Sequence, residues 1–200
     1  MDLKRDLEFI YEAGSLRFVQ RTWRQFLNSD FQNVAEHTLR VMWISLILAK
    51  RENVKDIDKV IKMALIHDLI ETKTGDVNYL SKQFTKRFEE QAVEETLKDT
   101  SIEELKHLWY EYKKRESIES KIVKDADFLD IDVELQEQSM KGNNIKRELQ
   151  PIREAVYQKL FTKSAKELWK LIQQSNPHER HIKGTYAFIL GDTKKDNELK

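Results

Sequence analysis

The sequence predicts an all-α protein, and three observations support this. Among its 200 residues, 40% are hydrophobic and 35% are charged, with only five Gly and two Pro, which is typical of helix-rich globular proteins. Apolar residues recur at helical spacing along most of the chain, and no run of alternating residues indicates a strand. The chain is also long enough to bury a sizeable core. We therefore expect a helical bundle.

The first expected helix covers residues 2–12 and ends at Gly14, before a polar and aromatic connection. The next helix is predicted to follow Asn33, because Asn33 and Glu36 have the spacing of a capping box. We expect its buried stripe to consist of Leu39, Met42, Trp43, Leu46 and Ile47.

A third helix is predicted to begin after Asp56, a good N-cap residue, and to end at the turn Thr74-Gly75-Asp76. Four further helices are expected, with Pro151 in the first turn of the last one. Their ranges are 81–98, 102–115, 117–140 and 149–174. After Pro177 the helical signal fades, so we expect a loop and then a solvated tail at residues 181–200.

The charge balance and the length of the apolar stretches argue against a nucleic-acid-binding, membrane or secreted protein. Lys plus Arg equals Asp plus Glu, at 35 each, so no overall field attracts nucleic acid. The longest apolar stretch, Val41–Ala49, is too short to span a bilayer, and the first residues lack a signal-peptide core. We therefore expect a cytoplasmic protein that binds neither nucleic acid nor a membrane. Cysteine is absent, so a metal site would use His, Asp and Glu.

The stretch MALIHDLIETKTGD joins the end of an apolar helix to several polar groups. His67 and Asp68 are adjacent, and at a helix end both can lean toward one point, where an imidazole and a carboxylate suit a first-row metal. Alone, such a pair is weak evidence, because it arises by chance. Glu71 lies one turn after His67 on the same side, but a solvated carboxylate at a helix end fits as well. Asp76 is equally compatible with a turn-forming role.

Two residues from other helices complete a candidate ligand set. His37 faces inward, because the residues at i+4 and i+7 are apolar, although a core histidine bonded to a backbone carbonyl fits the same pattern. Asp127 lies on the buried side of its helix, and a buried Asp is rare unless it is paired or binds a metal. The alternative for Asp127 is an ion pair with Lys124. Asp125 and Asp130 are interpreted as surface charges.

In this order, His37, His67-Asp68 and Asp127 resemble the metal site of the HD-domain phosphohydrolase superfamily. The sequence segments around these residues resemble more narrowly those of the YfbR-like and HDDC-type 5′-deoxynucleotidases. The resemblance runs from about residue 3 to about residue 140. The segments that carry it are RTW, NVAEHTLRV, ALIHDLIETKTGD, LWYEYKKRES and KIVKDADFLD.

The resemblance implies an HD-domain helical bundle at residues 1–180 with a single metal site in its core, an additional C-terminal helix at about 149–174, and a flexible tail at 181–200. It also implies an enzyme, often a homodimer, that removes the 5′-phosphate from deoxyribonucleoside 5′-monophosphates. Its cofactor would be one divalent ion. Imidazole ligands favour a transition metal such as Mn, Co, Fe, Ni or Zn over Mg.

The roles of single residues are implied by the same resemblance. Asp68 and Glu71 would be catalytic, with Glu71 orienting water or protonating the leaving oxygen. Arg21 would bind phosphate, Asp76 would bond the sugar 3′-hydroxyl, and Trp23 would wall the sugar pocket against a 2′-hydroxyl. The RTW spacing departs from relatives that have Arg directly before Trp or read RTGW, and this departure concerns Trp23. The metal ligands would be His37, His67, Asp68 and Asp127.

Other functions are compatible with parts of this pattern. A triphosphohydrolase acting on dNTPs would use the same metal, with Lys73 or Lys82 supporting a longer phosphate chain. Hydrolases of guanosine tetraphosphate typically carry HDxxED, whereas this chain reads HDLIET, so we favour them less. A non-catalytic helical adaptor would be expected to have a damaged site, and every expected ligand is present here.

Two further groups of residues have open roles. His178, Glu179 and His181 lie in an expected loop, so we interpret them as solvated surface groups rather than as a second metal site. Trp109 and Tyr112 are candidates for a dimer seam.

Overall fold

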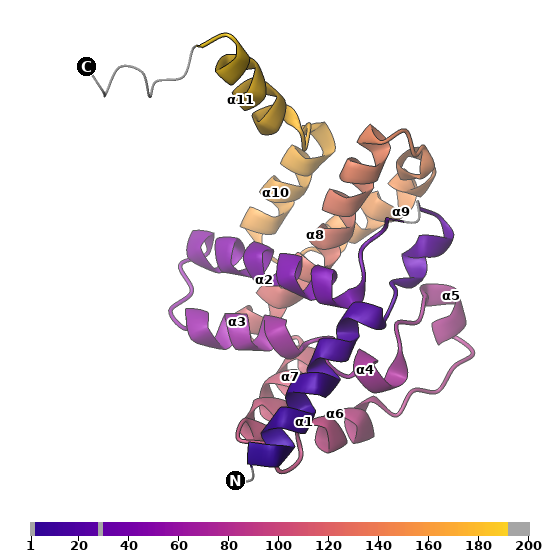
Figure 1. Cartoon of the computed structure of the whole chain (residues 1–200), viewed down its shortest axis with the longest axis vertical. Coiled ribbons are helices and arrows are strands. Elements are labelled where there is room, and N and C mark those ends of the chain that lie inside the picture. Colours follow the sequence, from indigo (N-terminus) through magenta and orange to yellow (C-terminus); the bar gives the residue numbers. More distant parts are fainter. Residues whose placement is uncertain (1–2, 28–29, 192–200) are drawn as a thin grey trace.

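A computed structural model describes residues 3–27 and 30–191 (Figure 1). Within these ranges every regular element is helical, apart from an isolated antiparallel bridge between Gln20 and Asn33, so the all-α prediction is confirmed. The α-helices are α1 (Leu3–Gly14), α2 (Val34–Arg51), α3 (Ile57–Ile66), α4 (Glu71–Thr74), α5 (Tyr79–Lys82), α6 (Glu89–Leu97), α7 (Lys106–Lys114), α8 (Ile118–Met140), α9 (Ile145–Lys159), α10 (Lys163–Gln174) and α11 (Glu179–Ile189). Short 3₁₀ turns are η1 (Ser15–Phe18), η2 (Thr22–Gln25) and η3 (Glu103–Leu105).

The centre of the fold is formed by α2, α3 and α8, which pack against one another. Val41 and Leu48 of α2 and Ile122 and Leu129 of α8 are fully buried in this core. Helix α7 packs against α3, and α10 packs along α8. Since α2 and α3 are antiparallel neighbours in Figure 1, the start of α2 lies beside the end of α3.

The predicted buried stripe of α2 is wrong in its main positions. Leu39, Trp43 and Ile47 are 57%, 60% and 50% exposed. The helix is apolar over more than one side, and the side that packs on the core is the one that carries His37 and Val41. Both capping predictions are confirmed, because the capping box at Asn33 is present and the Asp56 side chain accepts from the N–H of Lys59.

Three of the expected helices are each divided into two. The helix expected after Asp56 forms α3 and α4, the segment 81–98 forms α5 and α6, and the segment 149–174 forms α9 and α10. The break between α9 and α10 is held by Asp125, whose carboxylate accepts from the backbone N–H groups of Phe161 and Thr162 at 2.9 and 2.8 Å. Pro151 lies inside α9 rather than in its first turn, since α9 begins already at Ile145.

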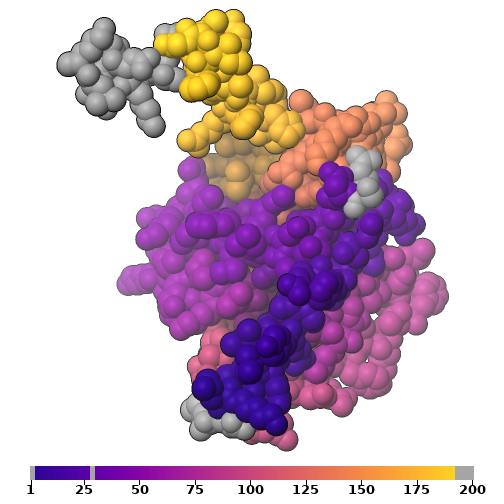
Figure 2. Space-filling view, in the orientation of Figure 1, coloured from indigo at the N-terminus to yellow at the C-terminus, as the bar shows by residue number. Residues whose placement is uncertain are grey.

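The expected loss of helix after Pro177 is also wrong, because α11 follows. The turn before α11 begins at Asn176, whose side-chain Oδ1 accepts from the backbone N–H of His178 at 2.9 Å. No residue of α11 is buried, and the helix projects beyond α10 (Figures 1 and 2). Part of the expected tail, residues 192–200, lies outside the described residues, and the division of the chain at residue 180 stays a prediction.

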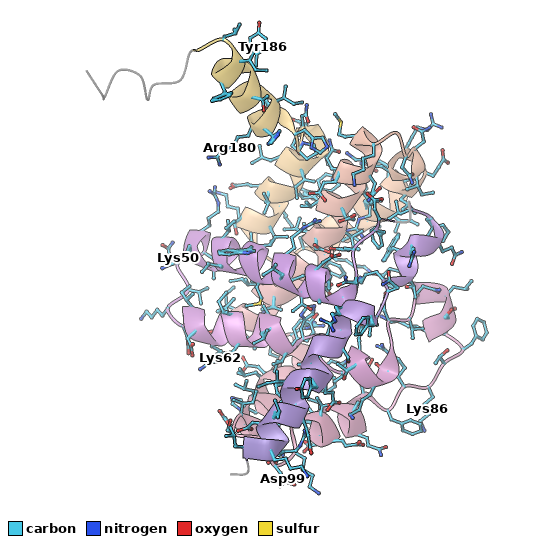
Figure 3. All side chains as sticks on the ribbon, viewed as in Figure 1. Lys50, Lys62, Lys86, Asp99, Arg180 and Tyr186 are labelled. Atoms are coloured by element: carbon cyan, nitrogen blue, oxygen red, sulfur yellow. The ribbon has the colours of Figure 1, made fainter. Side chains whose placement is uncertain are left out.

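None of the described helices combines the length and apolarity needed to cross a bilayer. In Figure 3, Lys50 and Lys62 lie on one edge of the outline and Lys86 lies on the opposite edge.

Candidate metal centre

Three helices bring the predicted ligands together. His37 lies in the first turn of α2, where its backbone N–H bonds to Asn33 O, so the capping box fixes its position. His67 follows the last residue of α3, and Asp68 lies in the turn before α4. Asp127 comes from α8, whose packing against α2 and α3 turns it toward both histidines.

The donor atoms of these residues converge on one point. His37 Nε2 lies 3.3 Å from His67 Nε2, and Asp68 Oδ2 lies 3.3 Å from each of these nitrogens. His37 Nε2 lies 3.4 Å from Asp127 Oδ1. Neighbouring ligand atoms bound at about 2.1 Å to one ion lie about 3 Å apart. The four side chains therefore fit a divalent cation, and His37, His67 and Asp127 alone already form a compact donor group.

The second nitrogen of each imidazole has a fixed partner. His67 Nδ1 donates to Ala64 O at 2.7 Å, and His37 Nδ1 donates to Asp130 Oδ2 at 2.6 Å. Both partners are acceptors, so each ring in its neutral form presents the lone pair of Nε2 to the shared point. Second partners of this kind orient metal-binding histidines.

Asp130 is a site residue that the sequence interpretation missed. It was interpreted as a surface charge, but Asp130 and Asp125 are both fully buried. Besides His37, Asp130 Oδ2 accepts from Gln32 Nε2 at 2.5 Å. The available signal was its position three residues after Asp127, which places both carboxylates on one side of α8.

The electrostatics of the metal-free centre favour a positive charge. Burial and Arg21 lower the pKa of His37, but the carboxylates of Asp130 and Asp127 outweigh them and raise it well above its ordinary value. Burial raises the pKa of Asp68, but His67 and His37 outweigh it and hold that pKa well below its usual range. In the metal-free centre, a proton on the His37 imidazole therefore balances the negative charge of the carboxylates. A bound cation would balance the same charge.

Glu71 is held in an environment that favours its neutral form. It is 4% exposed, and burial together with Asp68 and Asp76 raises its pKa to about 9. Arg87 Nη1 lies 3.8 Å from Glu71 Oε1. Among the described residues, Glu71 Oε2 has no hydrogen-bond partner, so this buried oxygen is available to a ligand.

The turn that carries Arg21 and Trp23 is tied to the end of α4. Asp76 Oδ2 accepts from the backbone N–H of Thr22 at 2.7 Å and from its hydroxyl at 3.1 Å. The positive φ of Gly75, 66°, allows the chain to turn there. Arg21 is buried and reaches Asp68 Oδ2 with Nη1 at 3.4 Å. Both predicted substrate-binding segments therefore border the metal centre.

A pocket of about 150 Å³ opens over the centre. Trp23 stands at its wall with its ring edge-on to that of Tyr79, at 6.3 Å between centroids. Lys82 lines the pocket, whereas Lys73 is paired with Glu12 at 2.8 Å and does not. The cationic lining residues are Arg21, Lys82, Arg87, Lys113, Arg115 and Lys124.

The aromatic pair proposed for a dimer seam belongs to this pocket instead. Trp109 and Tyr112 are 1% and 3% exposed, so they are inaccessible to a partner. The Tyr112 hydroxyl donates to Asp127 Oδ2 at 3.3 Å, and Lys124 Nζ lies 2.8 Å from the same oxygen. Asp127 therefore forms the ion pair with Lys124 and also belongs to the donor group.

The C-terminal group of His178, Glu179 and His181 is not part of the candidate metal centre. His178, Glu179 and His181 are exposed, the last two on α11, which confirms that they are surface groups although not in a loop throughout. Within residues 3–27 and 30–191, the His37, His67 and Asp127 group is the candidate metal cluster that the geometry provides.

Comparison with known proteins agrees with this geometry. The family model described as HD domain matches residues 13–174. The chain belongs to the HD-domain family. Among curated relatives of this HD domain, 5′-deoxynucleotidase HDDC2 of Dictyostelium discoideum is 34% identical over 134 residues, which cover 60% of this chain and 70% of the relative. The human HDDC2 protein is 29% identical and covers 60% of this chain and 62% of its own length.

More distant relatives extend the comparison. 5′-Deoxynucleotidase YfbR of Escherichia coli is 28% identical, over 68% of this chain and 75% of YfbR. A conserved hypothetical protein of Pyrococcus furiosus has a solved structure that matches with a TM-score of 0.71 at 28% identity, covering 84% of this chain and 99% of that one. A structure described as a predicted metal-dependent phosphohydrolase of Magnetospirillum magnetotacticum, at 22% identity and a TM-score of 0.69, matches in fold over 86% of this chain and 91% of that one. The predicted family and enzyme class are confirmed.

Proposed function

We propose that this HD domain removes the 5′-phosphate from deoxyribonucleoside 5′-monophosphates with the help of one divalent metal ion. The observation that carries this proposal is the convergence of two imidazole nitrogens and two carboxylate oxygens beside a pocket that the buried Glu71 also lines. The names of the HDDC2 and YfbR relatives support the same substrate class.

The metal would be held by His37, His67, Asp68 and Asp127. When bound, it lowers the pKa of water and draws charge from the phosphoryl group. Two imidazole ligands favour Mn, Co, Fe, Ni or Zn over Mg, so we propose a transition metal. Asp130 and Ala64 O keep the two rings in the tautomer that this requires.

Glu71 has the properties of a general acid. In the metal-free protein, a pKa near 9 keeps the Glu71 carboxyl protonated at neutral pH, and we propose that Glu71 delivers this proton to the leaving 5′ oxygen. Its position one turn after His67 would bring it beside a phosphate bound over the metal centre. General acid catalysis of this kind contributes about 10² to 10⁴ in rate.

The remaining pocket residues would orient the nucleotide. Arg21 offers a planar guanidinium to the phosphate, and its contacts with Asp68 and Asp76 hold it in place. Asp76 would accept from the 3′-hydroxyl. Trp23, braced by Tyr79, would leave no room for a 2′-hydroxyl, which would favour deoxyribose.

A dNTP triphosphohydrolase is the second candidate, because Lys82, Arg87 and Lys113 add cations to the pocket beyond those that a monophosphate needs. Its metal site would be the same. A non-catalytic adaptor is disfavoured by the intact donor set. Only the position of bond cleavage separates the two hydrolases.

We also propose that the chain acts in the cytoplasm as a homodimer without nucleic acid. The exposed side chains of Leu39, Trp43 and Ile47 follow one another at four-residue spacing on one side of α2, and such a contiguous apolar stripe supports a dimer interface. The formal net charge of zero disfavours nucleic acid. Light scattering of wild type and Trp43→Glu tests the dimer, and a monomeric wild type rejects it.

The experiment for the activity is a panel of dAMP, AMP and dATP incubated with Mn, Co, Ni, Zn or Mg. We expect inorganic phosphate and deoxyadenosine from dAMP, with weaker release from AMP. Triphosphate released from dATP would favour the second candidate. No product from any nucleotide with any metal would leave the proposed function without support.

A further inference from the structure

The backbone at Arg115 has a conformation that its side chain disfavours. Arg115 ends α7 with φ 59° and ψ 30°, in the left-handed region where helices usually place Gly. Three non-glycine residues within the described ranges have a positive φ, and the other two are Asn53 and Asp99. Asn and Asp tolerate this region through local hydrogen bonds, whereas Arg does not. Such outliers cluster at functional sites.

This conformation holds the guanidinium at the wall of the pocket. The Arg115 guanidinium carbon lies 3.4 Å from the centroid of the Tyr112 ring, and Nη1 donates to Tyr112 O. Tyr112 in turn packs edge-on against His67 and donates to Asp127. Arg115 therefore stacks on Tyr112, the side chain that contacts the proposed metal ligands His67 and Asp127. Arg115 also lines the pocket.

Charge pairing distinguishes Arg115 from most other cations of the pocket. Arg21 is shared between Asp68 and Asp76, and Lys124 is paired with Asp127. Arg87 and Lys113 are both paired with Glu89. Arg115 has an ion pair with no carboxylate of the described residues, and its stacking on Tyr112 leaves most of its N–H donors available.

Lys82 also lacks a carboxylate partner among the described residues, but it is exposed and its ammonium lies 5.8 Å from the Tyr79 ring. A flexible, exposed ammonium is a weak anchor compared with a stacked guanidinium, whose planar fork matches two phosphate oxygens. Arg115 is thus the pocket cation that is both held in place and not neutralised by a carboxylate.

We propose that Arg115 is a phosphate-binding residue of this site, in addition to Arg21. This rests on the proposed function, in which the substrate carries a phosphate. The strained backbone at the end of α7 is retained because it presents the guanidinium to that phosphate. A glycine there would suit the backbone better but would leave the phosphate without this partner.

The deciding variant is Arg115→Gly in the metal-loaded protein. We expect its Tm to equal or exceed that of wild type, because glycine relieves the backbone. Its affinity for inorganic phosphate, measured by calorimetry, should fall about tenfold or more, the usual effect of losing a charge-assisted hydrogen bond. KM for dAMP should rise by a similar factor. Arg115→Lys keeps a charge and should lie between the two.

Two controls separate binding from capping. Asn53→Gly relieves the same backbone conformation at an exposed position outside the pocket, so it should leave phosphate affinity unchanged. Lys114→Ala removes an exposed cation next to Arg115 and should also leave it unchanged. If Arg115→Gly binds phosphate as tightly as wild type, Arg115 only caps α7 and the proposal is overturned.

The same data distinguish this proposal from the function on which it rests. A wild type that hydrolyses dAMP while Arg115→Gly keeps its phosphate affinity overturns only the role of Arg115. A wild type that binds phosphate without hydrolysing dAMP removes the proposed function, and the phosphate affinity of Arg115→Gly still decides the role of Arg115.

Discussion

His37 and Asp130 form a buried pair in which His37 Nδ1 donates to Asp130 Oδ2 at 2.6 Å, across 93 residues of sequence. Both side chains have no exposed surface. Because a carboxylate can only accept here, the pair fixes the tautomer of His37 and directs the lone pair of Nε2 toward His67 and Asp127. Asp130 therefore prepares the centre for a cation without contacting it.

Replacing Asp130 by Asn should weaken metal binding about 10- to 100-fold, the usual effect of losing a carboxylate behind a histidine ligand. Competition with a chromophoric chelator measures this affinity. Asp125→Asn is the matched control, since Asp125 is equally buried on α8 but bonds to Phe161 and Thr162. It should lower Tm and leave metal affinity unchanged. Wild-type metal affinity in Asp130→Asn would contradict a positioning role.

Removing a proposed metal ligand should remove the metal. We expect His67→Ala and Asp68→Ala to lose metal retention and turnover together, whereas Asp58→Ala should retain both, because the Asp58 side chain is 73% exposed. Chelation of wild type should also lower its Tm, since an ion present at 100 times its Kd stabilises the fold by about 2.7 kcal/mol. Metal content by mass spectrometry that is unaltered in both variants would place the ion elsewhere.

The candidate centre could be predicted from sequence because its pieces carry strong local signals. His67, Asp68 and Glu71 fall within one turn of a helix end, and Asn33 with Glu36 fixes the helix of His37. The geometry brings these together with Asp127, although their catalytic roles stay predictions.

The misses at Asp130 and in the α2 stripe have a common physical cause, since both depended on contacts between distant parts of the chain. Asp130 belongs to an acidic run that resembles a solvated surface until its partner His37 is known. The stripe of Trp43 was chosen because α2 is apolar on two sides, and only packing on α8 decides which side is buried. Arg115 gave no signal, because its φ cannot be read from residue type.

Glu71→Gln should separate metal binding from catalysis. Glutamine keeps the size of the neutral carboxyl but has no proton to deliver, so metal should be retained while turnover of dAMP falls about 10² to 10⁴-fold. Glu8→Gln, on the exposed side of α1, is the control and should behave as wild type. Normal turnover in Glu71→Gln would exclude Glu71 from proton transfer.

The raised pKa of Glu71 also predicts how stability depends on pH in the metal-free protein. Its pKa is about 9 in the fold and 4.5 ordinarily, so the folded state holds a proton that the unfolded state releases between these values. The contribution of Glu71 to stability is complete below pH 4.5 and is lost as pH rises through 9, by at most about 1.4 kcal/mol per pH unit.

Glutamine removes this titration. Denaturant unfolding in the presence of a chelator should therefore show Glu71→Gln gaining stability relative to wild type between about pH 6 and about pH 8.5. Other groups titrate equally in both proteins and cancel in the difference. A difference that is constant with pH would mean that Glu71 is not held neutral.

Trp23→Ala tests whether Trp23 discriminates between deoxyribose and ribose. Trp23 stands edge-on to Tyr79 at the pocket wall, so its removal should open space beside the sugar. We expect the ratio of kcat/KM for dAMP over AMP to fall up to about tenfold, mainly because AMP improves. Phe26→Ala is the matched control, since Phe26 contacts the Trp23 ring but does not line the pocket. Because a rigid wall can exclude a hydroxyl only where it meets the sugar, an unchanged ratio in Trp23→Ala would place the selectivity on other pocket residues.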